Sequence, residues 1–348
     1  MKIKAAILTA LNKPLVIDEI TLPNTLKYGQ VLVKIICSGI CGSQIGEMLG
    51  VKGDDHFLPH LLGHEGGGIV KEIGPGVTKV KKNDKVVMHW RKGRGIESET
   101  PKYKLGKKTI NAGWVTTFNE YAVVSENRLT SVSQDIDFDT AALLGCAVTT
   151  GFGVINNDAK LKIGESIAIF GVGSVGITAI QGASLVSAYP IIAIDLHDHK
   201  LKQAKTFGAT HLINAARQNV ALELYKIVGN HGVDVAIDTT GNSQVIELAY
   251  ELTSAQGKTV LVGVLDKKNK IAIHTLPLHF DKTLVGSHGG GCFPSSDVPN
   301  YLKLIKLSKI KIKEMITHRI KLDNINRAIE DIKKGIIGKC VIDMESDS

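Results

Sequence analysis

The sequence has no pair of cysteines in a C-x-x-C arrangement, few aromatic residues and no long hydrophobic run. Its five cysteines are scattered through 348 residues, which excludes a zinc ribbon and argues against a disulfide framework. No apolar stretch approaches the roughly 18 residues of a membrane helix. The basic, apolar start lacks a small-residue cleavage site and continues as an alternating strand. These absences predict a cytoplasmic protein with reduced thiols.

The charge balance is basic, with a formal net charge of +8, but it does not indicate nucleic-acid binding. Lysines are spread along the chain, and aromatic residues make up only 5% of it, so basic and aromatic residues do not interleave. Hydrophobic residues make up 43%, as in ordinary globular proteins. We therefore expect a small-molecule substrate and neither a nucleic acid nor a membrane as partner.

Two kinds of pattern divide the chain. Residues 1 to about 150 contain short alternating strands separated by glycine turns, which predicts a mostly antiparallel β domain. From about residue 160, strand-like runs are each followed by a stretch with helical spacing, which predicts a parallel, doubly wound sheet. Residues 91–113 are polar and basic, and we expect them to form a loop.

A glycine-rich segment, SIAIFGVGSVG, lies between a predicted strand and a predicted helix. Its Gly171-x-Gly173-x-x-Gly176 spacing is weak evidence alone in a chain with 36 glycines, but both flanks fit a dinucleotide site. Gly171 permits a tight turn, Gly173 lets a pyrophosphate approach the backbone, and Gly176 allows close packing of strand and helix. The helix N-terminus then offers free N–H groups to phosphate.

Asp195 ends the next strand, IIAID, at the distance where such sites place a ribose-binding carboxylate. A carboxylate there repels a 2′-phosphate, so the sequence predicts NAD rather than NADP. The alternative is that Asp195 caps the following helix. Lys200 could lie near the ribose, or it could be a solvated charge on that helix.

Three residues with metal-ligand side chains lie in small-residue surroundings: Cys41 in SGICGS, His64 in LLGHEG and Cys146 in LLGCAVTTG. A catalytic zinc needs only three protein ligands and one open position, and separate loops can supply them. Each residue has an ordinary alternative, because buried free cysteines are common and a lone histidine is more often structural.

The order of these motifs resembles the zinc-containing medium-chain dehydrogenases, the family of alcohol, sorbitol and threonine dehydrogenases. Cys-x-Ser, Gly-His-Glu, Gly-Cys-x-x-x-Thr-Gly and the glycine-rich unit follow in register, from MKIKAAIL to GKCVIDM. The resemblance implies an α/β protein with a GroES-like, mostly-β catalytic domain over residues 1–150, to which 289–348 return. It implies a Rossmann NAD-binding domain over 151–288, and zinc-dependent hydride transfer between NAD and an alcohol or carbonyl.

The resemblance also implies roles for individual residues. Zinc would be held by Cys41, His64 and Cys146, with Glu65 close to the metal and able to replace its water. Ser43 would pass on the alcohol proton, and Thr150 and Val175 would pack behind the nicotinamide. The other residues implied to bind the cofactor are Val262, Val264, Ser287 and Gly289 at the carboxamide and Lys339 at the pyrophosphate.

Three departures from the family pattern change these expectations. The segment Arg91–Gly113 lacks the four cysteines that bind a structural zinc in many members, which predicts one zinc and not two. Gln44 replaces the aspartate that orients the ligand histidine, so it could accept a hydrogen bond but brings no charge. Gly46 stands where a histidine often ends the proton relay, so the proton would leave through Glu47 or water.

The substrate pocket is expected beside Trp90, where the family places an aromatic wall. Arg91, Lys92 and Arg94 follow directly, which favours an anionic or highly hydroxylated substrate, a polyol, sugar or sugar derivative. The alternative is that these charges belong to a solubilising loop. Trp114 and His288 also fall at positions that resemble pocket walls.

Family members associate through the edge of the Rossmann sheet, which implies a homodimer or homotetramer. Three other functions remain open. They are a zinc-free enone or quinone reductase of the same superfamily, a binding or regulatory member without turnover, and transient oxidation within a lyase or epimerase cycle.

Overall fold

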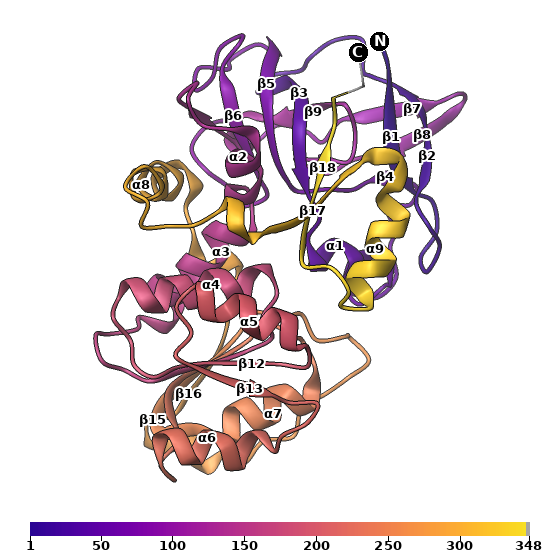
Figure 1. Ribbon diagram of the computed structural model, residues 1–348. Helices are drawn as coiled ribbons and strands as arrows, with labels where there is room; N and C mark the ends of the chain where they lie inside the picture. Colours follow the sequence, from indigo (N-terminus) through magenta and orange to yellow (C-terminus); the bar gives the residue numbers. More distant parts are fainter. Residues whose placement is uncertain (346–348) are drawn as a thin grey trace. The chain divides into compact units, whose positions relative to one another are not determined.

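The computed structural model describes residues 1–345, which fall into two compact units. The barrel unit comprises Met1–Cys146 and Phe293–Ser348, and the parallel-sheet unit comprises Ala147–Cys292 (Figure 1). The chain thus leaves the barrel unit after Cys146 and returns to it at Phe293. The boundaries expected from the sequence, at 150 and 289, lie a few residues away.

Five strands of the barrel unit close into a barrel in the order β1-β2-β7-β8-β4. They are β1 (Lys2–Leu8), β2 (Val16–Thr21), β7 (Lys102–Leu105), β8 (Lys108–Asn111) and β4 (His60–Leu61). In β1, Ile3, Ala5 and Ile7 belong to the barrel core, whereas Ala6 and Leu8, which alternate with them, are buried in the neighbouring core cluster of the unit. This alternation places every second side chain in the barrel core, as the pleat of a strand requires.

The expectation of a loop over residues 91–113 was wrong in part, because β7 and β8 form an antiparallel hairpin there. Tyr103 and Ile110 are fully buried and lie opposite each other in the hairpin. The lysines that alternate with them made the segment look uniformly polar. Their side chains take the solvent-facing positions, so the hairpin buries one apolar face.

A second, seven-stranded sheet completes the barrel unit, in the order β10-β6-β5-β3-β18-β17, with β9 also paired to β3. Its strands are β3 (Gln30–Gly39), β5 (Glu65–Ile73), β6 (Lys85–His89), β9 (Tyr121–Ser125), β10 (Leu129–Val132), β17 (Ile316–Lys321) and β18 (Lys339–Asp343). The final strand β18 pairs with β3, so the returning chain is built into this sheet.

Short helices connect the strands of the barrel unit. They are α1 (Gly42–Met48), α2 (Phe138–Leu144), α8 (Pro294–Lys306), α9 (Ile325–Lys333) and the 3₁₀ turns Glu126–Arg128, Lys313–Met315 and Leu322–Asn324. Helix α1 begins directly after Cys41. The position of α1 therefore places residues 41–47 at the end of β3.

The parallel-sheet unit contains a six-stranded sheet in the order β13-β12-β11-β14-β15-β16. All neighbouring strands are parallel. The strands are β11 (Ile167–Phe170), β12 (Ile191–Asp195), β13 (His211–Asn214), β14 (Val233–Asp238), β15 (Thr253–Leu261) and β16 (Thr283–Gly286). Counted along the chain this is the order 3-2-1-4-5-6 of a Rossmann sheet, which confirms the predicted fold class.

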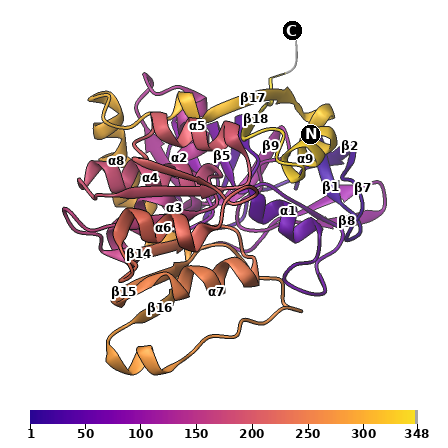
Figure 2. The same cartoon turned by 60° about the horizontal axis from the view of Figure 1, so that its bottom comes forward.

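Helices cover both faces of this sheet, with α4 and α5 on one side and α6 and α7 on the other (Figure 1). The helices of this unit are α3 (Ala147–Gly153), the π-helical turn Val154–Ala159, α4 (Ser174–Leu185), α5 (Asp198–Thr206), α6 (Val220–Val228), α7 (Ser243–Glu251) and the 3₁₀ turns Leu276–Phe280 and Gly289–Gly291. Strand β15 ends at Leu261, and β16 is an edge strand of the sheet (Figure 2).

Within residues 1–345, no single helix is long and apolar enough to cross a membrane. Phe138–Leu144 and Ala147–Ala159 pass that test only when they are taken together across a bend, by length and composition alone.

Candidate metal centre and dinucleotide site

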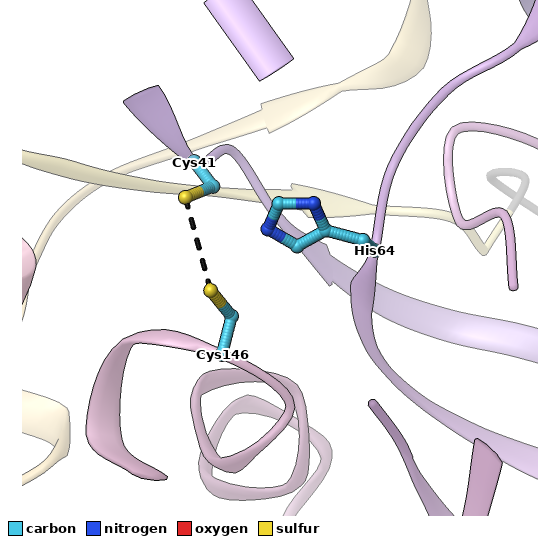
Figure 3. Close-up of side chains that lie close together, drawn as sticks. All are labelled: Cys41, His64 and Cys146. Carbon is cyan, nitrogen blue, oxygen red and sulfur yellow. Dashed lines mark hydrogen bonds between the residues drawn. The ribbon is translucent and has the colours of Figure 1, made fainter. Parts of the chain in front are cut away.

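Cys41, His64 and Cys146 converge in the barrel unit (Figure 3). Cys41 lies between β3 and α1, His64 directly precedes β5, and Cys146 follows α2. Their candidate ligand atoms all lie within 4.8 Å of one another, and the two sulfurs are 3.8 Å apart. The fold thus brings together three residues that are far apart in the sequence.

This donor set fits Zn²⁺. Two sulfurs that bind one tetrahedral zinc at about 2.3 Å lie about 3.8 Å from each other, close to the separation seen here. The Nε2 atom of His64 is buried and has no hydrogen-bond partner among the described residues. A buried, unpartnered imidazole nitrogen is costly in a protein interior unless a cation occupies its lone pair. Two thiolates and one imidazole leave a fourth position open for water or a substrate oxygen.

The electrostatics of the cluster favour a thiolate. A hydrogen bond from the Cys146 thiol, together with the nearby His64, holds the pKa of Cys41 well below the usual cysteine value. The same hydrogen bond and burial raise the pKa of Cys146. Burial acts to lower the pKa of His64, but the negative charge on Cys41 outweighs it and raises the pKa.

Glu65 forms a buried ion pair with Lys339 next to this cluster. Both side chains are almost completely excluded from solvent, and the Lys339 amine also donates to the carbonyl of Ile40 at 3.3 Å. A Cβ atom on Gly39 would lie 2.5 Å from the Glu65 carboxylate, and one on Gly145 would lie 2.8 Å from the Glu65 Cα. Gly39 thus leaves room for the charged ends of the pair, and Gly145 leaves room for the backbone of Glu65. The expected contact of Lys339 with a pyrophosphate stays a prediction.

Helix α1 places two polar side chains around the ligands. The hydroxyl of Ser43 donates to the Cys41 sulfur at 3.3 Å. Gln44 accepts a hydrogen bond from the backbone N–H of Gly63 and donates to Glu47 at 3.2 Å. Gln44 thus accepts a hydrogen bond, as expected, and its donor is the Gly63 backbone. Gln44 holds the turn that precedes His64, because α1 directs its amide at that backbone.

Trp90, which follows β6, lies beside the candidate metal centre. Its ring centroid is 6.3 Å from that of His64. The guanidinium of Arg91 lies 5.7 Å from the Trp90 ring. Trp114, 47% exposed, is also in the barrel unit, where the Arg128 guanidinium stacks 4.9 Å from its ring.

Arg128 was not identified from the sequence. It is buried, donates to the carbonyl of Trp90 at 2.5 Å and pairs with Glu97 at 3.3 Å. It thereby links the two tryptophans. A lone arginine in the segment SENRL carries no local signal, because its partners come from distant parts of the chain.

The basic residues after Trp90 have different surroundings. Lys92 forms an ion pair with Glu97 at 2.7 Å, and the Arg94 guanidinium lies 6.0 Å from the Phe293 ring. The backbone N–H of Arg94 donates to the Ser295 hydroxyl. Arg91 is thus the basic side chain whose guanidinium lies near the Trp90 ring.

In the parallel-sheet unit, each glycine of the turn after β11 has its own geometric reason. Gly171 has a φ of +90°, which strongly favours glycine. Gly173 precedes α4, and a Cβ there would meet nothing within 4 Å, so this backbone is open to a ligand. A Cβ on Gly176 would lie 2.1 Å from the Gly171 carbonyl oxygen. The turn lies where the strand order reverses, between β11 and β14, the usual ligand position in such sheets.

Asp195 ends β12, and its carboxylate faces this turn. One oxygen accepts from the N–H of Val172 at 2.8 Å and the other from the N–H of His197 at 3.0 Å. His197, not Asp195, is the N-cap residue of α5, so the helix-cap alternative was wrong. Lys200, partly exposed, lies in the first part of α5.

The other predicted cofactor and pocket residues of the parallel-sheet unit lie on four segments. Thr150 is on α3, where its hydroxyl is buried with no hydrogen-bond partner in residues 1–345, and Val175 is on α4. The residues after β15 and β16 are Val262, Val264, Ser287, His288 and Gly289. Val264 is 54% exposed and His288 is exposed. Their roles stay predictions.

Comparisons with known proteins cover both units. The family model "Alcohol dehydrogenase GroES-like domain" matches residues 27–134, and "Zinc-binding dehydrogenase" matches residues 174–306. The chain is 32% identical to S-(hydroxymethyl)glutathione dehydrogenase of Paracoccus denitrificans, over 96% of this chain and 98% of that protein. It is 30% identical to an alcohol dehydrogenase of Malus domestica, over 99% and 98%. The structure of benzyl alcohol dehydrogenase from Acinetobacter calcoaceticus matches with a TM-score of 0.89 and 26% identity, over 99% of this chain and 100% of that one.

Proposed function

The chain belongs to the zinc-containing medium-chain alcohol dehydrogenase family, and on that premise we propose that it transfers a hydride between NAD and an alcohol or carbonyl, with zinc at Cys41, His64 and Cys146. The convergence of these three side chains carries the proposal. Zinc bound there supplies a Lewis acid that lowers the pKa of an alcohol, and NAD supplies the hydride acceptor. The zinc-free reductase alternative has no support from this ligand set.

We propose one catalytic zinc per chain and no structural zinc. Among residues 1–345, only one group of candidate metal ligands contains cysteine, namely Cys41, His64 and Cys146. The segment Arg91–Gly113 contains no cysteine. The β7–β8 hairpin in that segment is instead held by its pairing in the closed barrel and by buried Tyr103 and Ile110.

The residues around the ligands would control charge and protons. Ser43 donates to a ligand sulfur, and we propose that its hydroxyl takes the proton of an alcohol. Glu65 would lie near the metal, where Lys339 compensates its charge inside the protein. The positive charge of Lys339 also acts on both cysteines: it adds to the lowering of the Cys41 pKa and partly offsets the raised pKa of Cys146.

The cofactor would bind at the glycine turn of the parallel-sheet unit, with Asp195 selecting NAD. We expect Asp195→Asn to reduce the preference for NAD over NADP by about ten- to a hundredfold, because a like charge no longer opposes the 2′-phosphate. The asparagine keeps an acceptor for the N–H of Val172 or His197, so the turn should survive. The measurement is kcat/KM with each cofactor.

Asp198→Asn on the neighbouring helix α5 is the matched control and should leave the ratio unchanged. Equal use of both cofactors by the natural protein, or an unchanged ratio in Asp195→Asn, would show that this carboxylate does not select the cofactor.

The substrate proposed is a polyol, sugar or sugar derivative, and the contact between Arg91 and the Trp90 ring favours an anionic one. A panel of sugar alcohols, sugar phosphates and hydroxy acids, followed by NADH absorbance, tests the function and identifies the substrate. If the zinc-loaded protein oxidises none of these compounds, the proposed function is contradicted. The other proposed partner is a second copy of this chain, in a homodimer or homotetramer, because within residues 1–345 no further strand pairs with β16 at that edge of the parallel sheet.

For an anionic substrate, Arg91→Ala should raise KM by about ten- to a hundredfold, because a charge-assisted contact contributes about 1.5–3 kcal/mol. It should change KM little for a neutral alcohol. Lys92→Ala and Arg94→Ala are the matched controls, since Lys92 is paired with Glu97 and Arg94 lies at Phe293. If kcat/KM for the best substrate is unchanged in all three variants, the substrate is a neutral polyol or sugar and the basic residues form only a solvated loop.

A further inference from the structure

A second group of ligand-type side chains lies in the barrel unit, apart from the cysteines. Glu47 is on α1, Asp55 is in the connection that follows α1, and His60 is on β4. Their candidate ligand atoms all lie within 4.8 Å of one another. Asp55 and His60 have no role in the proposed reaction, and Glu47 has one only as a possible exit for the substrate proton.

Both ring nitrogens of His60 face oxygen atoms. Its Nδ1 is 2.9 Å from the Leu61 carbonyl oxygen, which can only accept, so Nδ1 carries a proton. Its Nε2 is 2.7 Å from a carboxylate oxygen of Asp55. A neutral imidazole has only one N–H, and His60 is just 6% exposed. The position between Nε2 and the Asp55 carboxylate therefore requires a cation, either a second proton or a metal ion.

Each of the three side chains has an outer hydrogen bond that fixes its orientation. The Leu61 carbonyl holds His60, the N–H of Phe57 donates to Asp55 at 2.9 Å, and the Gln44 amide donates to Glu47 at 3.2 Å. Hydrogen bonds of this kind orient metal ligands and set the histidine tautomer.

The charges of these side chains also favour a bound cation. In the described part of the chain, no ion pair joins Glu47 or Asp55 to a lysine or arginine, and the only paired group is His60. Asp55 thus has only the imidazole of His60 as a charge partner, and Glu47 has no basic side chain to compensate it among these residues. Three converging ligands and this excess of negative charge favour a divalent metal ion over a proton, which would satisfy only one contact.

We propose that Glu47, Asp55 and His60 bind an exchangeable divalent cation, separate from the zinc at the cysteines. Imidazole and carboxylate ligands suit an ion such as Mn²⁺, Co²⁺ or Zn²⁺, and the two carboxylates are partly exposed. The cation would join α1 to β4. Because α1 follows Cys41 and β4 leads to His64, it would brace the two segments that carry these ligands. Gln44 already connects the same segments through Glu47 and Gly63.

The test is a titration of the zinc-loaded full chain with Mn²⁺, in which the electron paramagnetic resonance signal reports free Mn²⁺. We expect one Mn²⁺ site per chain. Loss of an outer hydrogen bond alone typically costs about 10- to 100-fold in metal affinity, so Asp55→Asn and Glu47→Gln should each weaken binding at least that much. Asp54→Asn, the neighbouring exposed carboxylate, is the matched control and should bind as the natural protein does. His60→Gln, which removes the proposed imidazole ligand, and His56→Gln, which leaves the proposed ligands in place, form a second pair of test and control.

Measurements of zinc content and thermal unfolding check that each variant is folded. If Asp55→Asn does not fold, Glu47→Gln takes its place in the test. Absence of saturable binding up to millimolar Mn²⁺ would overturn the proposal and leave a proton as the cation. Equal affinity in Asp55→Asn and Asp54→Asn would also overturn it. No substrate is present, so either result is independent of whether the protein oxidises alcohols.

Discussion

Cys146→Ser should abolish zinc binding and alcohol oxidation while NAD affinity stays unchanged. A serine hydroxyl is not deprotonated near neutral pH, so only Cys41 and His64 would remain as ligands, one short of a catalytic zinc site. The glycine turn and Asp195 lie in the parallel-sheet unit and use none of these atoms. Elemental analysis should fall from about one zinc per chain to nearly none, and NAD binding is followed by fluorescence titration.

Cys37→Ser is the matched control. Cys37 is also buried in the barrel unit, but its thiol donates to Asp139 at 3.3 Å, and burial together with Asp139 raises its pKa. A serine can keep that hydrogen bond, so zinc content should not change. Zinc retained in Cys146→Ser, or two zincs per chain in the natural protein after removal of exchangeable ions, would contradict the proposed metal centre.

Lys339→Met should strongly destabilise the protein, by about 3–5 kcal/mol in the free energy of unfolding, because it leaves the buried Glu65 carboxylate without its cation. Burial acts to lower the pKa of Lys339, but the charges of Glu65 and Cys41 outweigh it and raise the pKa. The lysine is therefore charged in the interior and compensates Glu65. Urea unfolding of the zinc-loaded protein measures the loss.

The double variant Glu65→Gln/Lys339→Met should recover part of the stability, because it removes the unpaired charge. Lys2→Met is the matched control, since Lys2 pairs with Glu19 on the exposed side of β1 and should contribute little. If Lys339→Met is no less stable than Lys2→Met, the pair does not support the fold.

Much of the chemistry could be predicted from the sequence because it depends on local residue types. The glycine turn requires particular residues at fixed spacing between one strand and one helix, and Gly171 and Gly176 have the constraints that this spacing implies. The alternation of strand and helix patterns likewise predicted the parallel sheet. The order of Cys41, His64 and Cys146 was sufficient to propose a metal centre, although nothing local required them to meet.

Other features depended on contacts between segments far apart in the chain. Arg128 links Trp90 to Trp114, and Lys339 reaches Glu65, but neither arginine nor lysine has a neighbour in sequence that reveals its partner. The β7–β8 hairpin was missed because its lysines concealed two buried residues.

The sequence by itself determined the family, the fold class and the residue types available for zinc and NAD, because these follow from short motifs in a set order. Only the tertiary structure decided that Gln44 holds the Gly63 backbone, that Arg91 lies beside Trp90, and that Glu47, Asp55 and His60 gather around one position. The physical reason is that side-chain direction and burial depend on packing between strands and helices that the chain brings together only when it folds.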